Sequence, residues 1–167
     1  MVLPVIRYGS PLLRRKSIGF NGPEEIKTLS GDMSETLKRY EGIGLAAPQV
    51  SLLKNIFIID TNPLADKGVV SVEKVIVNPE IVDYGSDNSY YTEGCLSIPE
   101  IFEDILRPEK IEVRYRDENF DLHKEILDGI LARIFQHEYD HLNGVLFIDR
   151  LYPLKRKLIQ SRLKGIF

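Results

Sequence analysis

The feature that most constrains this 167-residue chain is a polar motif inside an apolar helical pattern, His137-Glu138-Tyr139-Asp140-His141. Two histidines four residues apart project from one side of a helix, so both imidazoles reach the same ion with a carboxylate beside them. The chain contains only three histidines and one cysteine, so two of its scarcest residues occupy this spacing. The motif predicts a helix that holds a metal ion for hydrolysis.

The residues around the motif predict that this helix, over 128–142, is buried. Ile130 and Ile134 fall on the same stripe as His137 and His141, so the histidines face inward. Two inward imidazoles without a partner would be costly in a dry core, and a bound metal removes that cost. The alternative is one hydrogen-bonded core histidine and one surface histidine.

Cys95 is the best candidate for the third metal ligand. It lies in the strand-like segment Glu93-Gly94-Cys95-Leu96-Ser97, where a glycine allows close approach of the backbone. A lone cysteine is more often an inert buried hydrophobe. One cysteine and two histidines, however, leave the fourth position of a tetrahedral site for water, which is typical of a catalytic centre.

Length and composition predict one domain over residues 1–167, large enough for its own core. A formal net charge of -3 argues against a general polyanion binder, so DNA is not an expected partner. No segment approaches the roughly 20 apolar residues of a membrane span. The single cysteine cannot form an intramolecular disulfide, which favours a reducing, cytoplasmic compartment.

The pattern of residues along the chain indicates a mixed layout of helices and strands rather than a βαβ repeat. An amphipathic helix is predicted over 23–40, a tightly packed loop over 42–50 and a hairpin turn over 116–119. His123 is assigned to the solvated face of its strand, opposite Leu122. Strands are predicted over 55–60, 74–82, 90–98, 110–115, 120–127 and 145–148, and a terminal helix over 152–163.

Three segments carry a resemblance to a known family. They are 42–49 (Gly-Ile-Gly-Leu-Ala-Ala-Pro-Gln), 93–97 (Glu-Gly-Cys-Leu-Ser) and 136–141 (Gln-His-Glu-Tyr-Asp-His). In order and spacing they match the motifs of peptide deformylases, and the chain resembles that family over nearly its whole length. The resemblance implies an α+β fold in which antiparallel strands pack around a central metal-binding helix, with an N-terminal amphipathic helix and a C-terminal helix.

The resemblance also implies an activity, the removal of the formyl group as formate from the N-terminal formyl-methionine of newly made polypeptides. This agrees with the site chemistry, since cleaving a formamide needs a strong nucleophile and a proton donor for the departing amine. Glu138 is expected to move that proton, the alternative being a carboxylate that only orients a ligand. The resemblance further implies that the Gln49 amide and the Leu96 N–H stabilise the oxyanion.

Substrate contacts follow from the resemblance alone. It places Gly42, Ile43, Gly44, Leu96 and Ile134 around an apolar pocket for the methionine side chain. Phe102 departs from the arginine that well-known members hold at this position, so contacts at the rim of the cleft do not carry over.

The bound ion and the partners are also expectations. Nitrogen and thiolate ligands suit Fe²⁺, Zn²⁺, Ni²⁺ and Co²⁺ alike, and the resemblance favours Fe²⁺. N-formylmethionyl peptides and nascent chains are the expected partners. The basic segment at Lys155, Arg156 and Lys157 predicts either contact with ribosomal RNA or a capping helix with a solvated charged face.

Two rival functions share part of this pattern. A zinc endopeptidase would use His137, Glu138 and His141, but such enzymes usually take the third ligand after the helix, and no histidine follows His141. The other rival is a non-catalytic, metal-stabilised module that binds nascent N-termini. Glu138 and Gln49 disfavour it, because binding alone needs neither a proton carrier nor an oxyanion donor.

Overall fold

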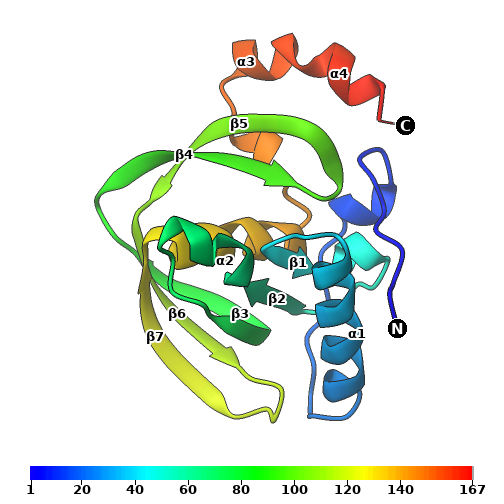
Figure 1. Ribbon diagram of the computed structural model, residues 1–167, viewed down its shortest axis with the longest axis vertical. Helices are drawn as coiled ribbons and strands as arrows, with labels where there is room; N and C mark the ends of the chain where they lie inside the picture. Colours follow the sequence, from blue (N-terminus) through cyan, green and yellow to red (C-terminus); the bar gives the residue numbers. More distant parts are fainter. Residues whose placement is uncertain (167) are drawn as a thin grey trace.

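Two antiparallel sheets hold the motif helix between them in the computed structural model, which describes residues 1–166 (Figure 1). The larger sheet has the strand order β1-β2-β3-β6-β7, and β4 pairs with β5 in a hairpin on the other side of α2. The strands are β1 (Gly44–Ala46), β2 (Ile56–Asp60), β3 (Glu73–Tyr84), β4 (Asn88–Cys95), β5 (Ile98–Pro108), β6 (Lys110–Arg116) and β7 (Leu122–Asp128). The helices are α1 (Ile26–Arg39), α2 (Gly129–Leu142), α3 (Pro153–Leu158) and α4 (Gln160–Lys164).

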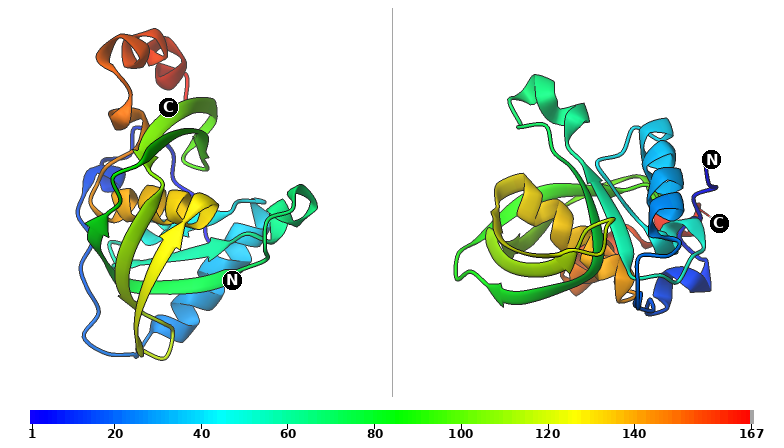
Figure 2. Two further views of the ribbon diagram at one scale, coloured as in Figure 1. Left: turned by 90° about the vertical axis from the view of Figure 1, so that its left-hand side faces the viewer. Right: turned by 90° about the horizontal axis from the view of Figure 1, so that it is seen from below.

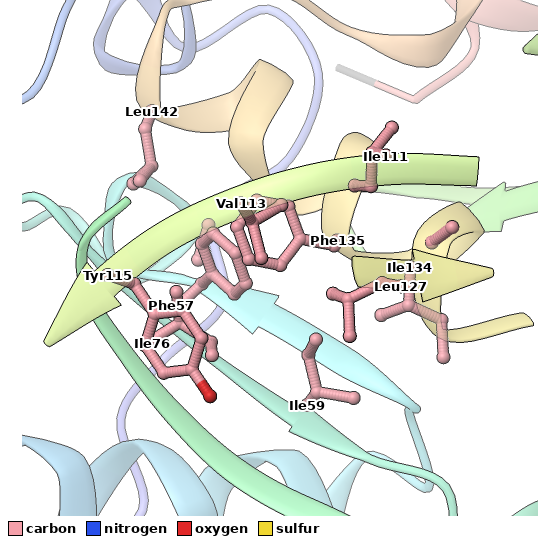
Figure 3. Close-up of a cluster of buried hydrophobic side chains, with 12 residues drawn as sticks. Phe57, Ile59, Ile76, Ile111, Val113, Tyr115, Leu127, Ile134, Phe135 and Leu142 are labelled. Carbon is pink, nitrogen blue, oxygen red and sulfur yellow. The ribbon is translucent and has the colours of Figure 1, made fainter. Parts of the chain in front are cut away.

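One helix packs on each face of the larger sheet, and β2 shows why. Successive side chains of a strand point to opposite faces. Ile56 and Ile58 pack in a cluster with residues of α1, whereas Phe57 and Ile59 pack on the α2 side, where the Phe57 ring meets the Phe135 ring edge-on at 5.0 Å (Figure 3). All five residues of β2 are therefore buried, and α2 is buried over most of its length from Ala132 onward.

A glycine with a positive φ lies at each end of α2. β7 leads directly into α2 through Gly129, which has a φ of +53° that favours glycine. At the other end Asn143 is the C-cap and Gly144 has a φ of +72°, a conformation in which helices commonly end at glycine. A Cβ at Gly144 would lie 2.5 Å from the carbonyl oxygen of Arg14, so only glycine lets the N-terminal segment pass this close.

The predicted α+β class and the antiparallel pairing are confirmed. The amphipathic helix, five of the six predicted strands and the hairpin turn between β6 and β7 lie where expected, to within a few residues. Three details were wrong. Residues 42–50 contain β1 and a 3₁₀ turn (Ala47–Val50), residues 145–148 lead into another 3₁₀ turn (Phe147–Arg150), and β5 was missed.

The C-terminal helix was predicted as one element and is two short helices, α3 and α4. They lie beyond the β4–β5 hairpin (Figures 1 and 2). Ile159 separates them and is buried together with Leu163 against the hairpin side of the molecule. No helix within residues 1–166 is long and apolar enough to cross a membrane.

The β7 strand faces the opposite way from the prediction. Leu122 and Ile126 are exposed, whereas His123 is partly buried, stacks on the Tyr115 ring and lies 2.8 Å from Oδ2 of Asp117 through its Nε2. Phe120 misled the assignment. It belongs to the turn, with a φ of +70°, so it does not share the alternation of the strand that follows.

Candidate active site

The three motifs meet at one point of the fold. His137 and His141 come from α2, and Cys95 comes from the end of β4 in the facing hairpin. The ligand atoms of these three residues all lie within 4.8 Å of one another, with Cys95 Sγ 3.3 Å from His141 Nε2. The structure therefore brings together the three residues that the sequence predicted as metal ligands.

The donor set fits a divalent ion. Ligands about 2.1 and 2.3 Å from one tetrahedral ion lie roughly 3.6 Å apart, close to the 3.3 Å between His141 and Cys95. Burial lowers the pKa of His137, but hydrogen bonds with Cys95 and Glu93 outweigh burial and raise that pKa well above its ordinary value. Positive charge is thus favoured where His137 faces Cys95, and a cation would supply it.

Glu93 orients one of the two imidazoles. Its Oε1 accepts a hydrogen bond of 2.8 Å from Nδ1 of His137, which leaves Nε2 of that ring for the ion. Burial raises the pKa of the Glu93 carboxyl, but hydrogen bonds from His137 and Arg107 outweigh it and hold the pKa far below its ordinary value. Glu93 is therefore a buried carboxylate.

Three arginines neutralise the buried acids around α2. Arg107 donates to Glu93 from Nε at 2.7 Å and to Asp140 from Nη1 at 2.8 Å. Arg133 donates to Glu93 at 2.9 Å, and Arg150 donates to both oxygens of Asp140 at 2.6 Å. Asp140 is thus paired with Arg107 and Arg150, whereas Arg133 pairs with Glu93.

Glu138 lies beside the ligand group, which is the set of candidate metal ligands Cys95, His137 and His141. Glu138 is 4% exposed. Its Oε2 has no hydrogen-bond partner within residues 1–166, and burial raises its pKa to about 7. Gly44 makes room for it, because a Cβ at that position would collide with Oε1 of Glu138. The site thus contains a buried carboxyl group suited to taking up and releasing a proton near neutral pH.

Gln49 is fixed by hydrogen bonds at both ends of its amide. Oε1 accepts from the Ala46 N–H at 2.8 Å, and Nε2 donates toward Ser97 Oγ at 3.3 Å and Cys95 Sγ at 3.4 Å. The donor end therefore points to the ligand group, where an oxyanion donor was predicted. Gln49 is 1% exposed, so its amide is held inside the protein rather than in solvent.

The predicted substrate residues line one cavity of about 640 Å³ that also reaches Gln49, Cys95, His137 and Glu138. Gly42 and Gly44 both lack a side chain that would fill space at this cavity. A Cβ at Gly42 would lie 2.7 Å from Leu37 Cδ1 and 3.0 Å from Leu96 Cδ1. The predicted set that the cavity brings together is Gly42, Ile43, Gly44, Leu96 and Ile134, and Phe102 lies at the same opening.

Sequence reasoning gave no role to Glu93, Ser97 or Arg150. A signal existed for Glu93 and Ser97, since both stand two residues from Cys95, and alternate residues of a strand share a face. Arg150 lies in a 3₁₀ turn after α2. No local pattern indicated that its side chain returns to the helix.

The fold and this group of residues define a class, the metal-dependent hydrolases. The family model described as polypeptide deformylase matches residues 2–157. A peptide deformylase of Cytophaga hutchinsonii is 41% identical over 99% of this chain and 91% of its own length. The chain belongs to the polypeptide deformylase family.

Solved structures agree with this assignment. A Plasmodium falciparum peptide deformylase in complex with an inhibitor is 35% identical, with a TM-score of 0.86 over 98% of each chain. A peptide deformylase from Legionella pneumophila is also 35% identical, with a TM-score of 0.87 over 99% of this chain and 95% of that one. The family assignment favours deformylation over an endopeptidase or a non-catalytic module.

Proposed function

We propose that Glu138 moves the proton in the hydrolysis of N-formylmethionyl peptides, with Cys95, His137 and His141 holding one divalent ion. As a family member the chain is a hydrolase that removes the N-formyl group from newly made peptides. The observation that carries the roles is the buried carboxyl of Glu138, with one free oxygen within residues 1–166, beside the Cys-His-His group.

The ion, when bound, lowers the pKa of the attacking water and polarises the formyl oxygen. Glu138 takes the proton from the water and later gives it to the amine nitrogen, so formate and a free amino terminus result. A pKa near neutrality suits both transfers, because the group must accept and release a proton in one turnover. Burial in the cavity floor produces that pKa.

Gln49 and Leu96 are proposed to stabilise the charge that develops on the formyl oxygen. The Gln49 Nε2 is held near Cys95 by its own amide oxygen, which is bonded to the Ala46 N–H. The Leu96 N–H is the second proposed donor, since Leu96 directly follows the cysteine. Donors fixed before reaction cost little reorganisation, and losing one typically lowers the rate about 10²–10³-fold.

The formyl-methionine is proposed to bind as an extended strand along the edge of β1. The Ile43 carbonyl accepts from the Asp60 N–H at 2.9 Å, so that residue bonds to β2. In an antiparallel edge strand the next residue, Gly44, then points its backbone groups toward the cleft. The methionine side chain would enter the apolar part of the cavity near Leu96 and Ile134.

The ion is proposed to be Fe²⁺, although the same donors accept Zn²⁺, Ni²⁺ and Co²⁺. We propose that residues 1–167 act as one catalytic unit in the cytoplasm. Contact with the ribosome through α3 and α4 rests on fewer free charges than the sequence suggested, since Lys155 pairs with Glu103 and Arg156 with Asp149. Co-sedimentation with ribosomes that persists without residues 154–167 would rule out this contact.

Release of formate from formyl-Met-Ala-Ser tests the function. Iron-loaded protein is expected to release formate, protein stripped with a chelator is expected to be inactive, and adding Fe²⁺ back anaerobically is expected to restore the rate. Cys95→Ser is expected to lose both bound metal and activity. Cleavage of an acetylated or internal peptide bond at a comparable rate would contradict the proposal.

A further inference from the structure

Two aromatic side chains form a rim on the active-site cavity, and the proposed mechanism uses neither. Phe102 on β5 is 66% exposed and Tyr91 on β4 is 47% exposed. Both line the cavity that also reaches Glu138, Cys95 and His137. Large aromatic rings at the opening of a cleft are apolar surface that a bound ligand can cover.

A break in the hairpin places Phe102 next to the reacting centre. The β4–β5 pairing jumps from Glu93↔Glu103 to Cys95↔Ile98, which leaves Gly94 opposite the bulged segment. Gly94 has no side chain, so the Phe102 ring lies on its backbone, with Cε1 2.5 Å from where a Cβ would stand. Since Gly94 directly precedes Cys95, the Phe102 ring packs on the residue next to a proposed metal ligand.

The second ring, that of Tyr91, packs against a buried arginine. The guanidinium carbon of Arg133 lies 5.7 Å from the centre of the Tyr91 ring, and Arg133 itself is buried and bonded to Glu93. Tyr91 is therefore the fixed part of the rim. Phe102 carries the larger exposed fraction and is the part that a ligand contacts most freely.

We infer that Phe102 makes this enzyme favour formyl-methionyl peptides with a large apolar side chain at one of the two residues after the methionine. The inference rests on the proposed function. An extended peptide advances about 3.3 Å per residue, so these residues leave the cavity past its rim. Covering the Phe102 ring with an apolar side chain removes surface from water on both partners, whereas a polar side chain loses hydration there.

A purely structural role for Phe102 makes a different prediction. Aromatic rings stabilise strands by covering glycines, and Phe102 covers Gly94. If this were its whole role, replacing Phe102 would lower stability and change the rates for all peptides by the same factor. A role in selection changes the ratio of rates between peptides, which stability alone does not move.

The test compares isosteric side chains in matched peptides. Formyl-Met-Ala-Ala is varied to leucine or asparagine at the second residue, and separately at the third, and kcat/KM is measured from formate release by the metal-loaded protein. We expect leucine to exceed asparagine by about tenfold at one of these positions, as burial of on the order of 50 Å² of apolar surface implies. Ratios near one at both positions would overturn the inference.

Variants assign the preference to the ring. Phe102→Gln is expected to bring the leucine-to-asparagine ratio close to one, whereas Phe102→Leu keeps most of it. Leu106→Gln is the matched control, because Leu106 is an exposed apolar residue of the same strand outside the cavity, and the ratio should not change. An unchanged ratio in Phe102→Gln contradicts the inference. A protein that releases formate from no peptide contradicts the proposed function itself.

Discussion

The inner and outer ends of the cleft are built differently. At the inner end Glu93, His137 and Glu138 are buried, and the first two are hydrogen-bonded to each other. At the outer end Phe102 and Lys67 line the same cavity and are exposed. Buried residues therefore position the groups that carry out the reaction. The exposed side chains at the opening are the ones that can contact the rest of the substrate and select it.

The inner end is rigid because ionic side chains connect its elements. Arg107 on β5 bonds to Glu93 on β4 and to Asp140 on α2. Buried charges are costly unless each is paired and hydrogen-bonded. Here the acids meet arginines on several sides, so removing one member leaves its partners uncompensated. Substitutions at the inner end should therefore affect every substrate.

The largest expected effect comes from Glu138→Gln. The amide has the shape of the carboxyl group but cannot carry the proton, so turnover is expected to fall about 10³-fold. The three ligand side chains are unchanged, and the metal content should match that of the wild type. Formate release and metal analysis on the same sample provide the measurement. Activity within tenfold of the wild type would refute the proton-carrying role.

Glu93→Gln is expected to be the most destabilising change at the inner end. Arg133 loses the acid it pairs with and Arg107 keeps only Asp140 as a buried counter-charge, at a cost of about 3–5 kcal/mol in the free energy of unfolding. Metal affinity should fall about tenfold, because His137 loses the acceptor that orients its ring. Denaturant unfolding and metal titration measure the two effects.

The matched control for that change is Glu103→Gln. Glu103 is the cross-strand partner of Glu93, but it pairs with Lys155, whose side chain is 49% exposed, and such an ion pair contributes about 0–1 kcal/mol. Equal losses of stability in the two variants would show that the buried arginine partners of Glu93 do not distinguish these carboxylates.

Gly44→Ala is expected to lower kcat about 10²-fold by displacing Glu138. The added Cβ collides with the end of the Glu138 side chain, and misplacing a catalytic group by about 1 Å can cost that much. Stability should change little, since only the side chain has to move. Gly31→Ala on α1 is the control, because no atom of residues 1–166 lies within 4 Å of its added Cβ. A normal kcat in Gly44→Ala would break the proposed link.

The sequence predicted the metal ligands because their constraints are local or scarce. The spacing of His137 and His141 fixes their common face on one helix turn, and Cys95 is the only cysteine. The strands of the larger sheet were found for a similar reason, since β2 and β3 are rich in isoleucine and valine.

The network and β5 could not be predicted because their causes are not local. β5 carries Glu100, Glu103 and Asp104, residues that are depleted in strands, and its inward Arg107 is explained only by acids from β4 and α2. β1 has three residues and pairs only along one edge. The direction in which β7 faces depends on the sheet it joins, so a turn residue such as Phe120 was enough to reverse the assignment.

The smallest expected effect lies outside the cleft, at Asp149. Burial raises its pKa, but hydrogen bonds from Arg14 and the Leu146 N–H outweigh burial and lower that pKa below its ordinary value of 3.8. The carboxylate therefore stabilises the fold at neutral pH, and this stabilisation is lost as the pH falls below the unfolded pKa and through the folded one.

Asp149→Asn should cost about 1 kcal/mol at neutral pH, and the difference from the wild type should shrink below about pH 4. Denaturant unfolding of both proteins at several pH values measures that difference. Because Asp149 does not line the cavity within residues 1–166, formate release at neutral pH should remain close to that of the wild type, for every peptide alike. A change in the ratio between peptides would mean that selection extends beyond the rim.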